Sequence, residues 1–163
     1  MRPLEPGDFD ALYAVASDPL LWELHFDPER WREARFRVFF DEALESGGAL
    51  LVMDAQSGDV IGSSRFKWRE EAGLHMEIGW TFLARSHWGG RYNRELKRLM
   101  LDHAFRFVDH VTFHVAEGNA RSMRAVEKIG ARLSGTYKLA SGRTGMRYVI
   151  ERTSYSGLNS SNG

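Results

Sequence analysis

The chain lacks cysteine altogether in its 163 residues. Disulfide bonds and thiolate zinc sites are therefore excluded, as is any covalent intermediate on a sulfur nucleophile. The six histidines are scattered, and the nearest pair, His110 and His114, lies around a predicted strand at 111–115 and not on a helix face. We therefore expect no metal site.

An excess of charge of one sign is also absent, since 22 basic side chains are balanced by 22 acidic ones. This balance argues against general binding to nucleic acid or to a membrane surface. No apolar run approaches the roughly 20 residues that span a bilayer, and residues 1–6 contain no apolar core of signal-peptide length. We expect a cytoplasmic protein with a single domain at 1–155 and a disordered polar tail at 156–163.

The stretch from residue 74 to residue 107 carries the clearest pattern. Its first part has the alternating period of a strand buried on one face, with apolar residues Leu74, Met76, Ile78, Trp80 and Phe82. From Tyr92 onward the apolar spacing becomes three and four residues, which predicts a long helix with the stripe Leu96, Leu99, Met100, His103, Ala104 and Phe107. Between the strand and the helix lie Trp88, Gly89 and Gly90.

A glycine turn at the start of a helix favours an anion site. The first N–H groups of a helix lack intrahelical partners, and glycine lets a phosphate approach them closely. Arg91 and Arg94 add positive charge at the same end. Neither the nucleotide-binding P-loop nor the dinucleotide glycine motif occurs in the chain. The alternative is that Gly89 and Gly90 only make a tight turn.

Glycine, proline and helix-capping residues predict the other elements. Asp8 is expected to cap a first short helix, and Asp27-Pro28-Glu29 to start a second helix that Gly47-Gly48 ends. Strands are expected at 49–53, 60–68, 111–115, 131–139 and 146–152, with a turn at 70–73 and a helix at 119–129. Antiparallel strands followed by a strand–helix–strand crossover predict a mixed α/β sheet flanked by helices.

Three motifs in order carry a family resemblance: Glu77-Ile-Gly-Trp80, Trp88-Gly-Gly-Arg-Tyr-Asn93, and Asn119-x-x-Ser122-x-x-x-x-Glu127-Lys128-x-Gly130. Together they resemble the GNAT superfamily of acyl-CoA-dependent N-acetyltransferases, in particular its RimJ/RimL-type branch, over about residues 2–152. The resemblance implies a mostly antiparallel sheet of about seven strands with a parallel splayed pair, and about four helices. Gly79 is a candidate bulge that opens the splay, although a glycine that eases packing is nearly as good an interpretation.

The sequence departs from the family pattern at two positions. Arg91 stands where the family loop has its middle glycine, and Val126 stands where the family often has a tyrosine that protonates the leaving thiolate. Ser122 is the best remaining donor, with Tyr137 as an outside alternative. Arg91 puts the geometry of the loop in question, and Val126 puts the identity of the general acid in question.

The resemblance implies acetyl-CoA as cosubstrate and a set of site residues. Those for the cofactor are Phe82, Trp88, Gly89, Gly90, Arg91, Tyr92, Asn93, Arg94, Asn119 and Ser122. Glu77 is the candidate base, directly or through water, and an ordinary solvent-facing strand glutamate is the equal alternative. Trp22, Trp31 and Phe40 are candidates to contact the acceptor, although aromatic residues on such helices are more often core. Asn119 and Ser122 also have structural interpretations, as a helix cap and a packing residue.

The predicted function is direct transfer of an acyl group, most simply acetyl, from acyl-CoA to a primary amine, without a metal. The amine is a protein N-terminus or a small molecule, and homodimer formation is left open. A CoA-binding module without catalysis and a purely structural or partner-binding domain are the alternatives. The enzyme and the CoA-binding module should both bind CoA, whereas a structural or partner-binding domain should not.

Overall fold

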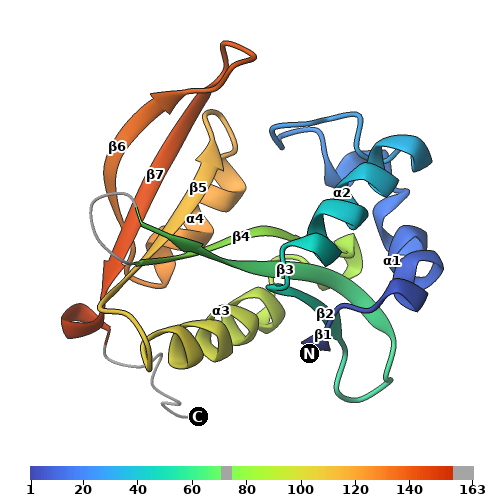
Figure 1. Ribbon diagram of the computed structural model, residues 1–163, viewed down its shortest axis with the longest axis horizontal. Coiled ribbons are helices and arrows are strands. Elements are labelled where there is room, and N and C mark those ends of the chain that lie inside the picture. The colour runs from blue at the N-terminus through green and yellow to red at the C-terminus, as the bar shows by residue number, and fades with distance from the viewer. Residues whose placement is uncertain (71–74, 156–163) are drawn as a thin grey trace. The chain divides into compact units, whose positions relative to one another are not determined.

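The computed structural model describes residues 1–70 and 75–155 (Figure 1). Its α-helices are α1 (Phe9–Ala16), α2 (Glu33–Glu45), α3 (Arg91–Ala104) and α4 (Ala120–Lys128). The strands are β1 (Arg2–Pro3), β2 (Ala49–Met53), β3 (Val60–Arg69), β4 (His75–Leu83), β5 (His110–Ala116), β6 (Arg132–Lys138) and β7 (Thr144–Glu151). Short 3-10 helices are η1 (Pro6–Asp8), η2 (Pro19–Leu21), η3 (Arg85–His87) and η4 (Arg152–Ser154).

The strands form a seven-stranded mixed sheet in the order β1-β2-β3-β4-β5-β7-β6. β4 and β5 pair in parallel, whereas β2 with β3, β5 with β7 and β6 with β7 are antiparallel. The predicted mixed sheet with four helices is thereby confirmed. The predicted tail at 156–163 and most of the predicted turn at 70–73 lie outside the described residues, as does Leu74. No helix in the described part of the chain is long and apolar enough to cross a membrane.

Helix α1 begins directly after Asp8, its N-cap residue, but the Asp8 side chain makes no cap bond, and the predicted start of the second helix is wrong. The Asp8 carboxylate accepts the N–H of Glu5 at 2.8 Å and does not cap α1. The Asp27 carboxylate accepts the N–H of Glu29 at 3.1 Å in a turn, and α2 begins only at Glu33. Both acidic side chains therefore bond to their local backbone, which is the usual competitor of helix capping.

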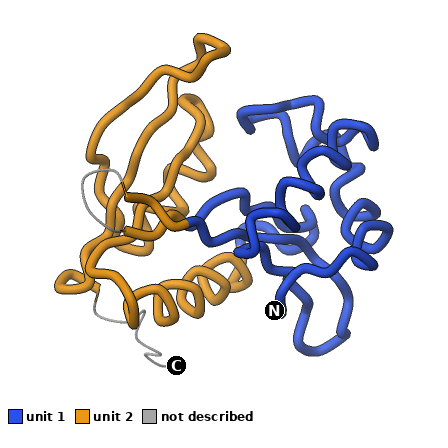
Figure 2. Tube along the Cα trace, in the orientation of Figure 1, with its two compact units in different colours: residues 1–67, 78–89 blue, residues 68–77, 90–163 orange. Residues whose placement is uncertain are grey.

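The chain divides into two compact units (Figure 2), residues 1–67 with 78–89 and residues 68–77 with 90–163. The core of the first unit is a cluster of aromatic and aliphatic side chains from α1, α2, β2 and β4. Phe36 is fully buried at its centre, with ring centroids 5.8 Å from Phe9 and 6.1 Å from Phe82. Such rings bury large apolar areas, so this cluster supplies much of the stability of the unit.

The second unit contains a sheet with chemically different faces. Residues alternate between the faces along β5, so Val111, Phe113 and Val115 lie on one side and are buried. Helix α3 packs on this apolar side, since Lys97 lies over the Phe113 ring at 5.7 Å. The opposite side is polar, with His110, Thr112 and His114 from β5, Glu77 and His75 from β4 and Arg147 from β7.

Helix α3 differs from its predicted stripe. Leu99 and Phe107 are exposed, and Phe107 follows the helix end. Leu101 and Lys97 are buried instead. The buried face, with Leu96, Lys97, Met100, Leu101 and Ala104, is therefore rotated by about one residue from the predicted one.

Candidate active site

The turn before α3 has the geometry of an anion-binding helix start. Gly89 adopts φ +69°, which only glycine adopts without strain. Gly90 is the N-cap residue, with extended angles of φ −108° and ψ −159° and no side chain that caps the helix. Gly90 therefore provides no side-chain cap for this 14-residue helix, whose first N–H groups have no intrahelical partners. The N–H groups at this helix start fit a phosphate.

The side chains that follow leave this helix start accessible. Arg91 is the first helical residue and is exposed, with its guanidinium 5.7 Å from the Tyr92 ring. An ordinary helical position needs no glycine, so Arg91 does not disturb the backbone of the turn. Arg94 is also exposed and Asn93 half-buried. Two arginine side chains thus supplement the positive end of the helix dipole.

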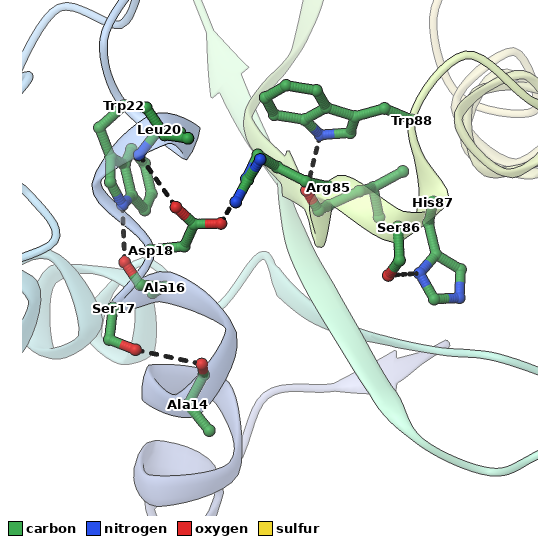
Figure 3. A network of polar contacts seen from close by, with 11 residues as sticks. Ala14, Ala16, Ser17, Asp18, Leu20, Trp22, Arg85, Ser86, His87 and Trp88 are labelled. Carbon is green, nitrogen blue, oxygen red and sulfur yellow. Dashed lines mark hydrogen bonds and ion pairs between the residues drawn. The ribbon is translucent and has the colours of Figure 1, made fainter.

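The segment that enters the turn is fixed by polar contacts within the first unit (Figure 3). The indole N–H of Trp88 donates to the Leu83 carbonyl at 2.8 Å. The Arg85 guanidinium donates to the Asp18 carboxylate, which also accepts the N–H of Leu20 at 3.0 Å. The hydrogen bond from Arg85 lowers the pKa of Asp18 below its ordinary value. Trp88 is therefore held by a hydrogen bond to Leu83, the last residue of β4.

The backbone of β4 is irregular at Trp80. Trp80 has φ +52°, the left-handed region that a side chain rarely adopts, so Trp80 and not Gly79 marks the distortion. The Trp80 ring lies 4.6 Å from the Arg65 guanidinium and 5.8 Å from the Lys67 ammonium. Such strained positions persist where surrounding contacts hold them, and they cluster at functional sites.

Glu77 is buried and ion-paired within the second unit. Its side chain is 4% exposed, and its Oε2 accepts the Nε–H of Arg69 at 2.7 Å, with Arg69 Nη2 at 2.5 Å from the same oxygen. Its other oxygen lies 3.8 Å from Nδ1 of His114. Glu77 is also the register partner of Thr112, at the point where β4 and β5 pair. The interpretation as a solvent-facing glutamate is excluded by this burial.

His114 and Tyr137 extend the group around Glu77. Their ring centroids are 5.1 Å apart, and the His114 side chain is 25% exposed. Burial lowers the pKa of His114, opposed by the charge of Glu77 and assisted by Arg69 and Arg147. Burial also raises the pKa of Tyr137. Nothing in the sequence pattern marked His114, because its proximity to Glu77 depends on the register of β4 with β5.

Helix α4 begins as its sequence predicts. Asn119 is its buried N-cap residue, and its side-chain oxygen accepts the N–H of Ser122 at 3.1 Å. The structural interpretation of Asn119 as a cap is therefore confirmed. Ser122 is half-buried one turn into the helix, and Val126, at the family's tyrosine position, is buried. A contact of Asn119 or Ser122 with a cofactor remains a prediction.

The aromatic residues expected near an acceptor lie mostly in the core of the first unit. Trp22 is 1% exposed and donates its indole N–H to the Ala16 carbonyl at 2.7 Å. Phe40 and Phe82 are each 3% exposed in the same core. Trp31 is half-buried at the edge of the cluster, and the Arg32 guanidinium lies 4.5 Å from its ring. Of the three acceptor candidates, Trp31 alone has an appreciably accessible side chain, and a cofactor contact of Phe82 remains a prediction.

Comparison with known proteins identifies the family. The sequence model described as "Acetyltransferase (GNAT) domain" matches residues 1–132. The chain therefore belongs to the GNAT acetyltransferase family, and the site described above lies in an N-acetyltransferase domain. No curated protein matches the sequence.

Solved structures share this fold. A GCN5-related N-acetyltransferase from Brucella melitensis is 20% identical, with a TM-score of 0.80 over 94% of this chain and 75% of that one. A GNAT-family acetyltransferase from Bacillus anthracis is 21% identical, with a TM-score of 0.74 over 92% of both chains. Spermidine N-acetyltransferase from Vibrio cholerae, solved with CoA and spermine, is 20% identical, with a TM-score of 0.72 over 97% of this chain and 96% of that one.

Within the described residues, no group of three or more histidine and carboxylate side chains could hold a metal ion. The residues present do fit a CoA cosubstrate at the start of α3, whose N-cap residue is Gly90. Its exposed arginines and backbone N–H groups match a pyrophosphate in charge and hydrogen-bonding capacity.

Proposed function

We propose that this protein transfers an acyl group, most simply acetyl, from acyl-CoA to a primary amine by direct attack in a ternary complex. The observation that carries the proposal is the glycine turn, with Gly90 as the N-cap residue of a long helix, in a chain of the GNAT family. In this proposal the N–H groups after Gly90 and the arginines Arg91 and Arg94 hold the phosphates. Trp88 keeps the turn in place through its bond to Leu83. The chain has no cysteine, which favours direct transfer over a thioester intermediate.

The acceptor must lose a proton before it can attack. With ordinary pKa values of about 10.4 for lysine and about 7.7 to 8.0 for an α-amine, deprotonation near pH 7.5 costs roughly 4 kcal/mol and under about 1 kcal/mol, respectively. The carboxylate of Glu77 is the proposed origin of base catalysis, directly or through an intermediary. A catalytic base contributes about 10²- to 10⁴-fold in rate. The benefit should be larger for a lysine-type amine than for an α-amine.

The loop and the short motifs favour the RimJ/RimL-type branch, whose members acetylate ribosomal-protein N-termini or small amines. An aliphatic polyamine also belongs among the acceptors to be tested, since the V. cholerae protein of this fold was solved with spermine. Peptide N-termini and small amines are thus both within the proposal.

A CoA-binding module without catalysis is the second candidate. Two departures from the family pattern favour it: Arg91 in the loop and the buried Val126 in place of a tyrosine. Arg91 is weak support for the module, because it occupies an ordinary helical position in which no glycine is needed. The missing tyrosine is a modest loss, because a thiolate with a pKa of about 8.5 is a good leaving group with little acid assistance.

A panel of amines tests the proposal. Purified protein is incubated with acetyl-CoA and peptide N-termini, lysine-type amines, polyamines or aromatic amines, and CoA release is measured against hydrolysis without amine. Amine-dependent release supports the enzyme. Tight acetyl-CoA binding with no release across the panel supports the module, and absence of binding contradicts both.

A further inference from the structure

We infer that His114 takes the proton from the acceptor amine and that Glu77 acts through it as a positioning residue. The inference rests on the proposed function and adds the residue that carries the proton. It starts from the polar face of the sheet in the second unit, where β4, β5 and β6 bring Glu77, His114 and Tyr137 together.

Glu77 itself is poorly placed to accept a proton from a substrate. It is 4% exposed, and its Oε2 is already held by two nitrogens of Arg69. Its Oε1 is directed to Nδ1 of His114 at 3.8 Å, outside hydrogen-bonding distance but within strong electrostatic range. A carboxylate beside Nδ1 favours the tautomer that carries its proton there, and Nε2 then has the free lone pair. His114 is the more accessible of the two side chains, at 25% exposure.

The surroundings of His114 keep its ring neutral near pH 7. The lowered pKa of His114 has burial as its main cause, and the positive neighbours Arg69 on β3 and Arg147 on β7 act in the same direction. His75 on β4 also lowers it, whereas the negative charge of Glu77 raises it. A neutral imidazole can accept a proton, and the adjacent Glu77 carboxylate stabilises the imidazolium that forms.

Tyr137 keeps the imidazole in place from β6. Its ring lies 5.1 Å from that of His114, and its phenol packs against the backbone of Gly145 on β7, where an added Cβ would lie 2.2 Å from Cζ of Tyr137. Gly145 thus makes room for the tyrosine ring. Substitution of Gly145 by alanine would displace Tyr137 and loosen the histidine without changing any titratable group.

The proton balance of the step is simple. One N–H bond of the ammonium breaks and an Nε2–H bond forms on His114. The freed lone pair of the amine then forms the new C–N bond as the C–S bond of the thioester breaks. The second amine proton accompanies the sulfur as a thiol, and the His114 proton passes to solvent. Glu77 and Arg69 change no bonds.

Two kinds of measurement test this assignment. In the first, the rate of CoA release is followed against pH for wild type, His114→Gln and His110→Gln. His110 is the matched control, because it lies on the same strand and the same face but stacks on His75 at 5.4 Å. His114→Gln should lower kcat by roughly 10²- to 10⁴-fold with acetyl-CoA affinity within a few-fold, and should abolish the acidic limb of the profile. His110→Gln should retain both.

The second measurement needs no activity. Nuclear magnetic resonance titration should give His114 a pKa below the ordinary 6.5, and Glu77→Gln should lower it further because the negative neighbour is removed. A His114 pKa indifferent to Glu77→Gln would overturn the pairing, even if His114→Gln did not fold. Unchanged rate and acidic limb in folded His114→Gln would overturn the assignment and leave Glu77 as the direct base. If wild type bound no acetyl-CoA in calorimetry, the proposed function would fail first and this inference with it.

Discussion

Three glycine positions allow the turn geometry and phosphate binding to be tested separately. Gly89→Ala places a side chain at φ +69°, and nothing lies within 4 Å of the added Cβ. The cost is therefore only that of the left-handed conformation, about 1 to 2 kcal/mol. For a protein of this size, each kcal/mol lowers Tm by about 2 to 4 °C. We expect a Tm about 2 to 8 °C below wild type, together with weaker acetyl-CoA binding because the turn relaxes.

Gly142→Ala is the matched control. Gly142 has φ +81° and also has nothing within 4 Å of an added Cβ. It lies in the turn between β6 and β7, where its N–H donates to the Leu139 carbonyl at 2.8 Å. The same backbone cost should give a similar loss of Tm, with acetyl-CoA affinity unchanged.

Gly90→Ala should show the opposite behaviour. Its φ of −108° is available to alanine, so Tm should change little. The added Cβ would stand at the helix start and hold the phosphate away from the N–H groups. Loss of one hydrogen bond to a charged group, about 1.5 to 3 kcal/mol, corresponds to about 10- to 150-fold in Kd.

Differential scanning fluorimetry and isothermal titration calorimetry on the three variants distinguish these effects. Wild-type affinity in folded Gly90→Ala would refute the assignment of the helix start to phosphate. Weakened binding in Gly142→Ala comparable to that in Gly89→Ala would show that stability alone explains the loss.

Three further outcomes are expected. Acetyl-CoA at about 100 times its Kd should raise the free energy of unfolding by about 2.7 kcal/mol and Tm by roughly 5 to 10 °C, and an unchanged Tm in scanning fluorimetry would contradict binding. Burial lowers the pKa of Lys97 to about 7 from 10.5. Between these pH values the unfolded chain binds a proton that the folded chain lacks, so stability should rise from about pH 7 to about pH 10.5, and Lys97→Met should abolish this rise in urea unfolding. Asn119→Ala should cost about 0.5 to 2 kcal/mol in urea unfolding through loss of the α4 cap, whereas Ser122→Ala, whose backbone N–H makes that bond, should cost less than about 0.5 kcal/mol.

The elements of the fold were largely predictable because local rules govern them. Strand β2 agrees residue for residue with its predicted range, and Gly130 ends the segment after α4 with φ +94°, as a helix-ending glycine should. The second helix start was misplaced because the Asp27 carboxylate accepts a nearby backbone N–H in a turn, and the Asp8 carboxylate, although at the N-cap of α1, accepts the N–H of Glu5 and no N–H of the helix. The apolar period also misplaced the buried face of α3, since it could not anticipate a buried lysine at Lys97.

The candidate site also contains features that the sequence predicts and features that it does not. The glycine turn was visible in the sequence because consecutive glycines and a following helix are local features. The positive φ at Trp80, in contrast, has no signal in the local sequence, and the Trp80 ring lies beside Arg65 and Lys67 on another strand. The contact between His114 and Glu77 depends on strand register across 37 residues of chain. No periodicity in one segment encodes such a contact.

Acetyl transfer itself is the central claim, and isotope tracing measures it directly. Acetyl-CoA labelled in the acetyl group is incubated with the protein and each amine, and product and free CoA are quantified by mass spectrometry. The account predicts labelled acetyl-amine and CoA in equal amounts, at a rate that Gly90→Ala lowers at limiting acetyl-CoA. Labelled acetate in place of acetyl-amine for every acceptor, or no turnover by protein that binds acetyl-CoA, would contradict it.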